Sequence, residues 1–349
     1  MDTRDTLEQA ELRRSARQLS SQLGPVTVAG LDDATRAERL AAAVGDAGWL
    51  ELRDDGGNGS PLASGVEAAI VADALGAAVA DVAFIGPVLA ADLARRAGLA
   101  EGQRSVVAYA PDLGGVAITA DGTTQTDAYT VDARPTTDSA YVLVPEGSGA
   151  RLGRVPVDAA SDETGGTDLT RVVRTIPAGT RAELVAGQER LLGPEDLAAW
   201  TALGLALTSA DLVGIMRGVL DVTVAYAAQR HQYGVPVGSF QAVQHLLAEA
   251  QCLWEGSLST AQYASWAVDL RDPQGAREAG RIAKAYSARA ARTVCETAVQ
   301  VHGGMGNTWE CIVHVYLRRA LLSSQWFGDD AVQLDALAHE RLGATNGLS

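Results

Sequence analysis

The sequence predicts a mainly α-helical protein with an inserted β-domain, ordered as an N-terminal helical domain, a middle β-domain and a C-terminal four-helix bundle. Apolar residues recur at helical spacing up to about residue 100 and again from about residue 194. Between these regions, short Val, Thr and Tyr runs alternate with Gly, Asp and Pro, which is typical of strands and turns. We place the domains at residues 1–102, 103–190 (a shortened β-domain) and 191–349.

The first domain predicts several helices. The stretch "DDATRAERLAAAVGDAGWL" begins with a candidate N-cap, Asp32 or Asp33. The stretch "SGVEAAIVADALGAAVADVAFIGPVLAADLARRAG" predicts two more helices, broken near Gly86–Pro87. A polar, glycine-rich loop, "RDDGGNGSP", lies between the two stretches.

The second and third domains differ sharply in pattern. "RSVVAYAPDLGGVAITADGTTQTDAYTVDARPTTDSAYVLVPEG" reads as strands with turns, continued by "RLGRVPV", "TRVVRTI" and "RAELVAG". From residue 195, three long helical patterns follow, which favour the antiparallel helices of a bundle. Their sequences are "EDLAAWTALGLALTSADLVGIMRGVLDVTVAYAAQRHQYG", "FQAVQHLLAEAQCLWEGSLSTAQYASWAVDL" and "GAREAGRIAKAYSARAARTVCETAVQVHGG".

Composition excludes several classes of function. The net charge of -15 argues against a nucleic-acid partner, because phosphate binding needs clustered Lys and Arg. We see no apolar run of membrane-spanning length and no export signal, and the three cysteines form no CxxC pair, so we expect a soluble cytoplasmic protein. The five histidines form no HxH or HExxH pair, so we expect no metal site.

Two C-terminal segments stand out. "AVQVHGGMGNTWE" places three glycines after a long helical pattern, where each costs roughly 1 kcal/mol of helix stability against alanine. The segments "QRHQYGVPVGSFQAVQHLLAEA" and "QVHGGMGNTWECIVHVYLRRA" resemble, in sequence and spacing, the R-x-Q-F-G and Q-x-x-G-G-x-G motifs of the acyl-CoA dehydrogenase family. A weaker similarity lies at Gly48–Trp49.

The resemblance implies a cofactor site shared between subunits. In this family FAD lies across a subunit interface, with its ring on one β-domain and its adenosine and pyrophosphate end on a neighbour's C-terminal domain. Arg230 would meet the pyrophosphate as a charge-assisted donor. The remaining cofactor-binding positions implied by the motifs are Gln232, Tyr233, Gln241, Gln300, Val301, Gly303 and Gly304.

Each motif residue also has a simpler interpretation. Arg230 could be a solvated cation at a helix end, and Gly303–Gly304 could be only a helix C-cap and turn. We expect His245 to be a packing histidine. We expect Glu310 to form a structural ion pair with Arg318 or Arg319.

The family's catalytic base is missing from this sequence. Counting from the glycine turn, the position of the usual glutamate falls on Phe327, followed by the expected Gly328. Counting back from Arg230, the alternative position used by a minority of the family falls near Gly204, in a stretch without Glu. Asp329 and Asp330, or Asp211, are the acids nearest to these two positions.

The family's flavin-ring motif is also absent, because "AYAPDLGGVAI" stands where hydroxyl-bearing residues would bind the ring. We therefore expect a non-catalytic subunit of an α2β2 acyl-CoA dehydrogenase of the steroid side-chain type. Its partner would supply the base, and electrons would pass to an electron-transfer flavoprotein. Two alternatives stay open: a self-sufficient homomeric flavoenzyme with an atypical base, and a flavin-free scaffold with the same fold.

Overall fold

A computed structural model describes residues 4–57, 59–99, 105–134, 136–158 and 166–343. Helices precede and follow a central run of strands, which confirms the predicted fold class. The helices are α1 (Leu7–Leu23), α2 (Ala34–Asp46), α3 (Gly65–Ala77), α4 (Ile85–Arg96), α5 (Pro194–Gln229), α6 (Gln241–Leu270), α7 (Pro273–His302), α8 (Val313–Gln325) and α9 (Asp330–Leu342). Short 3-10 segments are η1 (Val28–Asp32), η2 (Trp49–Glu51), η4 (Val237–Ser239) and η5 (Gly303–Asn307).

The strands form one main sheet and two small hairpins. They are β1 (Val106–Tyr109), β2 (Thr119–Ala120), β3 (Thr123–Thr124), β4 (Ala128–Val131), β5 (Ser139–Glu146), β6 (Gly149–Pro156), β7 (Val173–Ile176), β8 (Glu183–Leu184), β9 (His231–Gln232) and β10 (Val235–Pro236). The main sheet has the order β7-β4-β1-β5-β6-β8. Its strands pair antiparallel except for β1 and β5, which are parallel.

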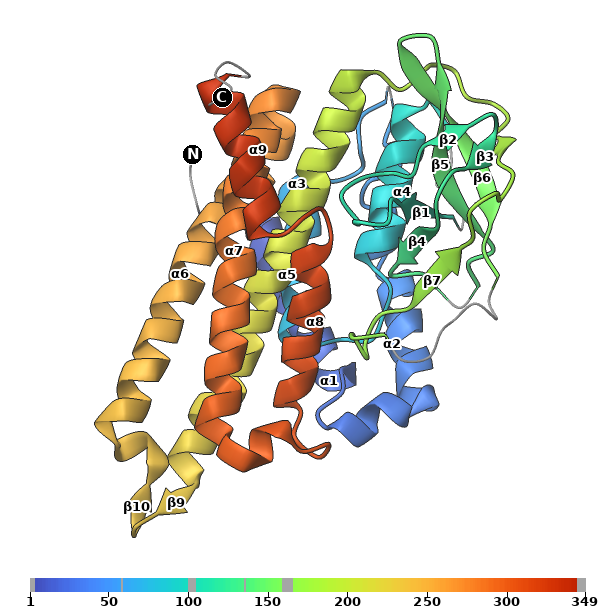
Figure 1. Ribbon diagram of the computed structural model, residues 1–349. Helices are drawn as coiled ribbons and strands as arrows, with labels where there is room; N and C mark the ends of the chain where they lie inside the picture. Colours follow the sequence, from blue (N-terminus) through green and yellow to red (C-terminus); the bar gives the residue numbers. More distant parts are fainter. Residues whose placement is uncertain (1–3, 58, 100–104, 135, 159–165, 344–349) are drawn as a thin grey trace.

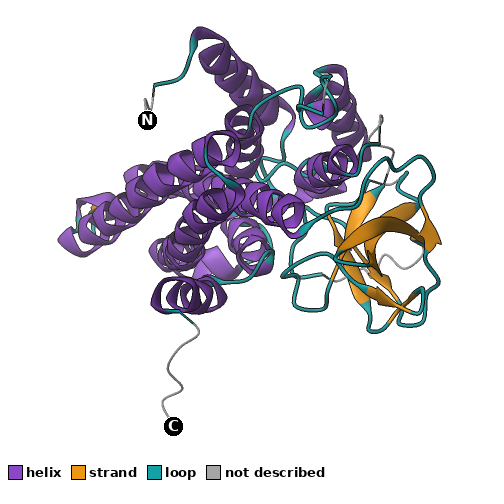
Figure 2. Ribbon diagram, turned by 90° about the horizontal axis from the view of Figure 1, so that it is seen from above, coloured by secondary structure: helices purple, strands orange, loops and turns teal. Residues whose placement is uncertain are grey.

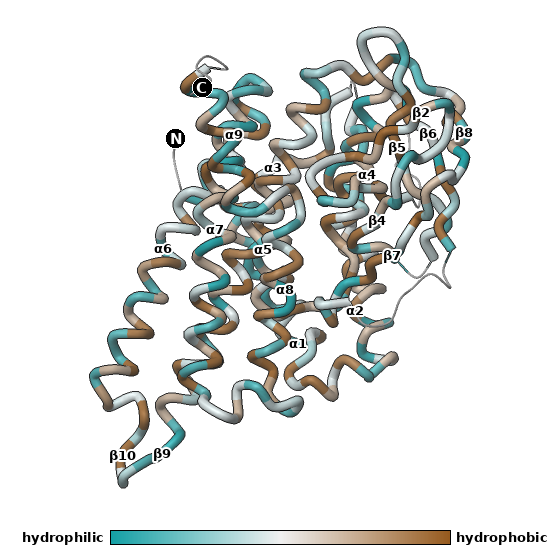
Figure 3. Tube along the Cα trace, in the orientation of Figure 1, coloured by the Kyte–Doolittle hydropathy of each residue, from teal (hydrophilic) through white to brown (hydrophobic). Residues whose placement is uncertain are grey.

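The sheet and the helical bundle lie on opposite sides of the molecule. The long helices α5, α6 and α7 run side by side, and α4 lies between α5 and the sheet (Figure 1). Seen from above, the strands of the main sheet gather at one edge of the molecule, and helices make up most of the rest (Figure 2). Along α6, hydrophilic and hydrophobic residues alternate, because one face of this helix packs on α5 and α7 (Figure 3).

Local sequence signals set the helix starts. Asp33 caps α2 by accepting a hydrogen bond from the Arg36 amide, so the second of the two candidate caps is the one used. The break between the next two helices is not at Gly86–Pro87, as expected, but at residues 78–84. Pro87 instead lies in the first turn of α4, where a missing backbone N–H costs no helical hydrogen bond.

Helix α5 forms the centre of the bundle. Gly214 and Gly218 allow α5 to pack very closely against α3. A Cβ on either glycine would lie 2.0 Å from a backbone carbonyl oxygen of α3. An 18-residue window of α5 has mean hydropathy 1.5, so the expectation that no apolar run reaches membrane-spanning length is wrong. Since 94% of this window is buried inside the protein, α5 is a core helix.

Candidate functional site

The two motif segments meet at one end of the helical bundle. The first runs from the C-terminus of α5 through the β9–β10 hairpin into α6, and the second runs from α7 into η5 (Figure 1). Tyr226 of α5 stacks on His302 of α7 with ring centroids 4.1 Å apart. Segments separated by about 70 residues therefore form one surface.

The β9–β10 hairpin is exposed on the surface of the protein. Residues 233 and 234 connect paired β9 and β10, and both have positive φ, 54° at Tyr233 and 81° at Gly234. Positive φ is uncommon for a residue with a side chain, yet Tyr233 is 95% exposed. Its ring makes an edge-to-face contact with Phe240, with centroids 6.4 Å apart, but burial within this chain does not explain the positive φ of Tyr233.

The predicted polar contacts are also free to bind an outside group. Arg230, Gln232, Gln241 and Gln300 are exposed, and Val301 is half-buried. Among the residues that the structure describes, the Arg230 guanidinium has no hydrogen bond or ion pair. Its backbone is fixed, since its amide donates to Tyr226 and its carbonyl accepts from Val237.

The three glycines of the turn, Gly303, Gly304 and Gly306, differ in what the structure requires of them. Gly303 has φ +62°, which favours glycine over any residue with a Cβ. At Gly306 a Cβ would lie 2.7 Å from the carbonyl oxygen of Val299, so packing requires it. Gly304 has neither a positive φ nor an atom within 4 Å of a built Cβ. The chain's own structure therefore does not require Gly304, whereas close approach by an outside group would.

The two candidate base positions touch each other in the core. A Cβ built on Gly204 would lie 2.1 Å from Cζ of Phe327, so the phenylalanine ring occupies the space in front of the glycine. Phe327 is 2% exposed and has φ +67°. Its amide donates to the carbonyl of Leu113 (2.9 Å), which lies in the loop where the family's flavin-ring motif would stand.

Four aromatic side chains fill the region around this contact, and we call them the aromatic cluster: Tyr109, Trp200, Trp326 and Phe327. Ring centroids lie 5.2 Å apart for Trp200 and Phe327, and 5.8 Å apart for Tyr109 and Phe327. The Trp200 indole donates to the carbonyl of Leu89 in α4 (2.9 Å). These rings are buried and close the space between α4, α5 and β1.

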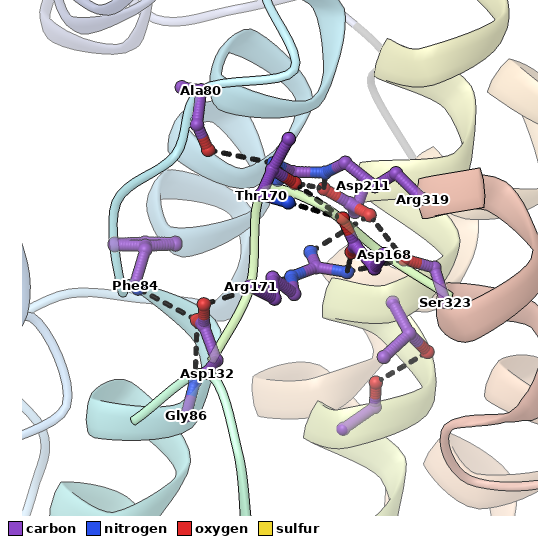
Figure 4. A network of polar contacts seen from close by, with 12 residues as sticks. Ala80, Phe84, Gly86, Asp132, Asp168, Thr170, Arg171, Asp211, Arg319 and Ser323 are labelled. Carbon is purple, nitrogen blue, oxygen red and sulfur yellow. Dashed lines mark hydrogen bonds and ion pairs between the residues drawn. The ribbon is translucent and has the colours of Figure 1, made fainter. Parts of the chain in front are cut away.

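Asp211 is bound in a network of buried charges and hydroxyls (Figure 4). Its carboxylate lies 2.8 Å from Arg319, 3.0 Å from Arg171 and 2.7 Å from the Ser323 hydroxyl, which donates to it. Burial alone would raise the pKa of Asp211, but the two arginines outweigh it and lower the pKa to about 2. A carboxylate held this way is a poor proton acceptor, so its role is structural.

The other two candidate acids, Asp329 and Asp330, lie at the start of α9. Asp329 caps α9, where its carboxylate accepts a hydrogen bond from the Val332 amide (3.0 Å). Asp330 lies half-buried in the first turn of the same helix.

Two minor expectations are wrong. Arg319 does form a structural ion pair, but with Asp211 rather than Glu310, because α8 turns it toward the bundle core. Glu310 is exposed, and Arg318 instead lies over the Trp309 ring, 5.9 Å from its centroid. His245 is exposed on α6 and is not a packing residue of this chain.

Sequence reasoning did not identify the aromatic cluster or the network around Asp211. The signal for the cluster was present, because Phe at one base position and Gly at the other are complementary in volume. Nothing in the sequence indicated that Arg171, in a loop before β7, would reach Asp211 in α5.

Comparisons with known proteins agree with this fold. Residues 202–342 match the model for the acyl-CoA dehydrogenase C-terminal domain. The chain is 37% identical over 233 residues to acyl-CoA dehydrogenase FadE34 of Mycobacterium tuberculosis, covering 62% of this chain but 30% of that protein. It is 29% identical over 324 residues to acyl-CoA dehydrogenase IpdE2 of Mycolicibacterium smegmatis, covering 86% of each.

Solved structures show the same architecture over the full chain. The steroid acyl-CoA dehydrogenase Tcur3481–Tcur3483 (G363A variant) superposes with a TM-score of 0.77 at 21% identity, covering 97% of this chain and 99% of the other. The ChsE4–ChsE5 complex of Mycobacterium tuberculosis gives 0.78 at 24% identity, covering 99% and 100%. Its motifs, its fold and these matches make the chain similar to the acyl-CoA dehydrogenase family, whose C-terminal domain is matched over residues 202–342.

Proposed function

We propose that this chain is the non-catalytic subunit of a heteromeric FAD-dependent acyl-CoA dehydrogenase. The observation that carries the proposal is the contact between Phe327 and Gly204. Both positions at which this family places its base lack a carboxylate, and the Phe327 ring fills the space between them. With Asp211 held by two arginines and Asp329 used as a helix cap, neither of these acids is free to act as a base.

The residues present fit one half of an FAD site and not the other. Arg230, Gln232, Tyr233 and Gln241 would hold the adenosine and pyrophosphate end on the hairpin side. Gln300, Val301, Gly303 and Gly304 would hold it on the glycine turn. The exposed Arg230 guanidinium, which has no partner among the described residues, and the uncrowded Gly304 support this assignment. In the loop where the flavin ring would bind, the Leu113 carbonyl accepts a hydrogen bond from the Phe327 amide.

The partner subunit would therefore supply the catalytic glutamate, the ring-binding β-domain and most of the acyl-CoA pocket. When bound, FAD supplies the hydride acceptor for α,β-desaturation of the thioester. This chain's own contribution is to bind and orient the far end of that cofactor. Electrons would pass on to an electron-transfer flavoprotein, in the cytoplasm.

A steroid side-chain CoA thioester is the substrate we propose. The support is similarity alone, since one solved relative is described as a steroid acyl-CoA dehydrogenase and another as a complex of two differently named chains. Filling one of two pockets with side chains would leave the partner's pocket free to accept a bulky acyl group. The substrate is the part of the proposal that rests on analogy.

Co-expression with the neighbouring acyl-CoA dehydrogenase gene tests the proposal. We expect the chain alone to be insoluble or flavin-free, and the co-purified complex to contain one FAD for every two chains. One FAD per chain, or full dehydrogenase activity without a partner, would support the homomeric alternative instead. Absence of flavin from the complex as well would support the scaffold.

A variant at the filled base position gives a second, independent test. Phe327→Leu keeps an apolar side chain in the core, so we expect the complex to retain its flavin and its rate of α-proton abstraction, measured as solvent deuterium exchange into the acyl-CoA. Loss of that exchange with flavin still bound would show that this chain contributes to the chemistry.

A further inference from the structure

A cavity of about 320 Å³ lies on the side of α5 away from the aromatic cluster and shares no lining residue with it. It is partly open to solvent and lies between α3, α5, α6 and α1 with the residues just before α1. Its walls are mostly apolar and include Ile70, Val213, Leu258 and Trp266. This volume is in the range of small-molecule sites.

Asp73 of α3 lines this cavity and also a second one, of about 670 Å³, between α1, α3, α5, α6 and α8. Its side chain is 12% exposed, and its ion pairs with Arg13 and Arg17 measure 3.7 and 3.6 Å. These distances exceed a hydrogen bond. Burial raises the pKa of Asp73, although both arginines oppose that shift. Because neither arginine lies within hydrogen-bond distance, the carboxylate keeps capacity to accept a hydrogen bond from a donor in the cavity.

The charges that line each cavity balance in number. Arg4, Asp5, Arg13 and Asp73 line the smaller cavity, and Arg17, Asp73, Arg217 and Asp221 line the larger one. Arg13 is held by Asp5 through two hydrogen bonds of 2.7 and 3.0 Å. In the larger cavity, Arg217 pairs with Asp221 at 2.8 Å. A charged ligand would add an unbalanced charge to a mostly apolar space, which is costly. A neutral ligand avoids that cost.

We propose that the cavity between α1, α3, α5 and α6 binds a neutral, hydroxyl-bearing aliphatic molecule, with its apolar body on the α5–α6 wall and its hydroxyl donating to Asp73. The site is separate from the shared cofactor surface and does not depend on the proposed function.

Matched ten-carbon probes test the ligand class on the full-length chain, alone or in its complex. We expect calorimetry to detect 1-decanol binding at least tenfold more tightly than decanoate, decylammonium or 1-chlorodecane. No 1-decanol binding, or equal binding of a charged probe, would overturn the proposal.

Variants locate the site. Ala69→Phe fills the cavity from α3 and should weaken 1-decanol binding at least tenfold. Val66→Trp, at a half-buried position of the same wall, should do the same if the first variant does not fold. Ala248→Phe adds the same ring at an exposed position of α6 outside the cavity and should change nothing. Binding that survives both filling variants would place the ligand elsewhere.

A further variant tests whether the Asp73 carboxylate accepts the hydrogen bond from the ligand. Asp73→Leu keeps the side chain's approximate shape but removes the acceptor. We expect it to abolish the preference for 1-decanol over 1-chlorodecane while leaving 1-chlorodecane binding within about twofold of the wild type. A preference that persists in Asp73→Leu would contradict the assigned hydrogen bond.

Discussion

The ring of Phe327 lies against the Cα of Gly204, and a Cβ built on that glycine would be 2.1 Å from the nearest ring carbon. The two residues are 123 positions apart in the sequence, yet the size of each side chain limits the size that the other position can accept. Because the glycine lies within α5, the contact also fixes the start of α9 relative to the central helix.

Gly204→Ala should therefore destabilise the fold, although alanine is the better helix former. The overlap with Phe327 should cost about 1–3 kcal/mol of unfolding free energy, measured by urea denaturation. Gly45→Ala is the matched control, because Gly45 is an exposed helical glycine of α2 with no atom near a built Cβ. It should stabilise the chain by about 1 kcal/mol. A neutral Gly204→Ala would mean that the Phe327 ring moves freely.

Gly304→Ala separates a cofactor role from a structural one. Since nothing lies within 4 Å of its Cβ and its φ is ordinary, the stability of the chain should not fall. The flavin content of the complex should fall, because the added methyl group blocks close approach of the cofactor to the backbone.

Arg230→Ala should lower flavin affinity about tenfold or more through loss of a charge-assisted hydrogen bond, measured by flavin fluorescence on titration. Full flavin retention in both variants would remove this surface from the site.

Asp211→Asn should strongly destabilise the protein. It would leave Arg171 and Arg319 buried without their shared carboxylate, at a cost of about 3–5 kcal/mol in urea denaturation. Asp221→Asn breaks a mostly exposed pair with Arg217 and should cost about 1 kcal/mol or less. Equal costs for the two variants would contradict the structural role of the network.

The pH dependence at Asp211 follows from the direction of its shift. The pKa of Asp211 in the folded protein, about 2, lies below the ordinary aspartate value of 3.8. Its stabilising contribution is therefore fully present above pH about 4 and is lost as pH falls toward 2. The difference in stability between wild type and Asp211→Asn should be constant from pH 5 to pH 8 and shrink only in acid.

Lys284 is the chain's single lysine, and it is fully buried in α7, donating to the carbonyl of Ser323. Burial lowers its pKa to about 7, against the weaker opposing effect of Asp211. Between pH 7 and about 10 the unfolded chain would hold a proton that the folded chain lacks, so stability should rise with pH. Lys284→Met should flatten that rise.

A direct measurement is available because only one lysine is present. In protein labelled with 13C-lysine, the single ε-carbon resonance should titrate near pH 7. A midpoint near pH 10 would show that the ammonium stays charged in the core.

Much of the fold was predictable from periodicity and end signals. The three bundle helices were expected within a few residues of α5, α6 and α7, because their apolar spacing is long and regular. The break before α4 was misplaced, since Pro87 is compatible with a first helical turn and its position alone does not separate the two cases. The domain boundaries at 102/103 and 190/191 and the cofactor-binding residues stay predictions.

The sequence by itself determined the fold class and the two motifs that resemble those of the family. It also has no glutamate at either position where that resemblance expects the base, because these features depend on residue identity and local spacing. The tertiary structure alone decided that Phe327 fills the space beside Gly204, that Asp211 is held by Arg171 and Arg319, and that the hairpin and the glycine turn share one surface. Packing and charge pairing join residues more than 100 positions apart or across separate helices, and no local pattern encodes such distances.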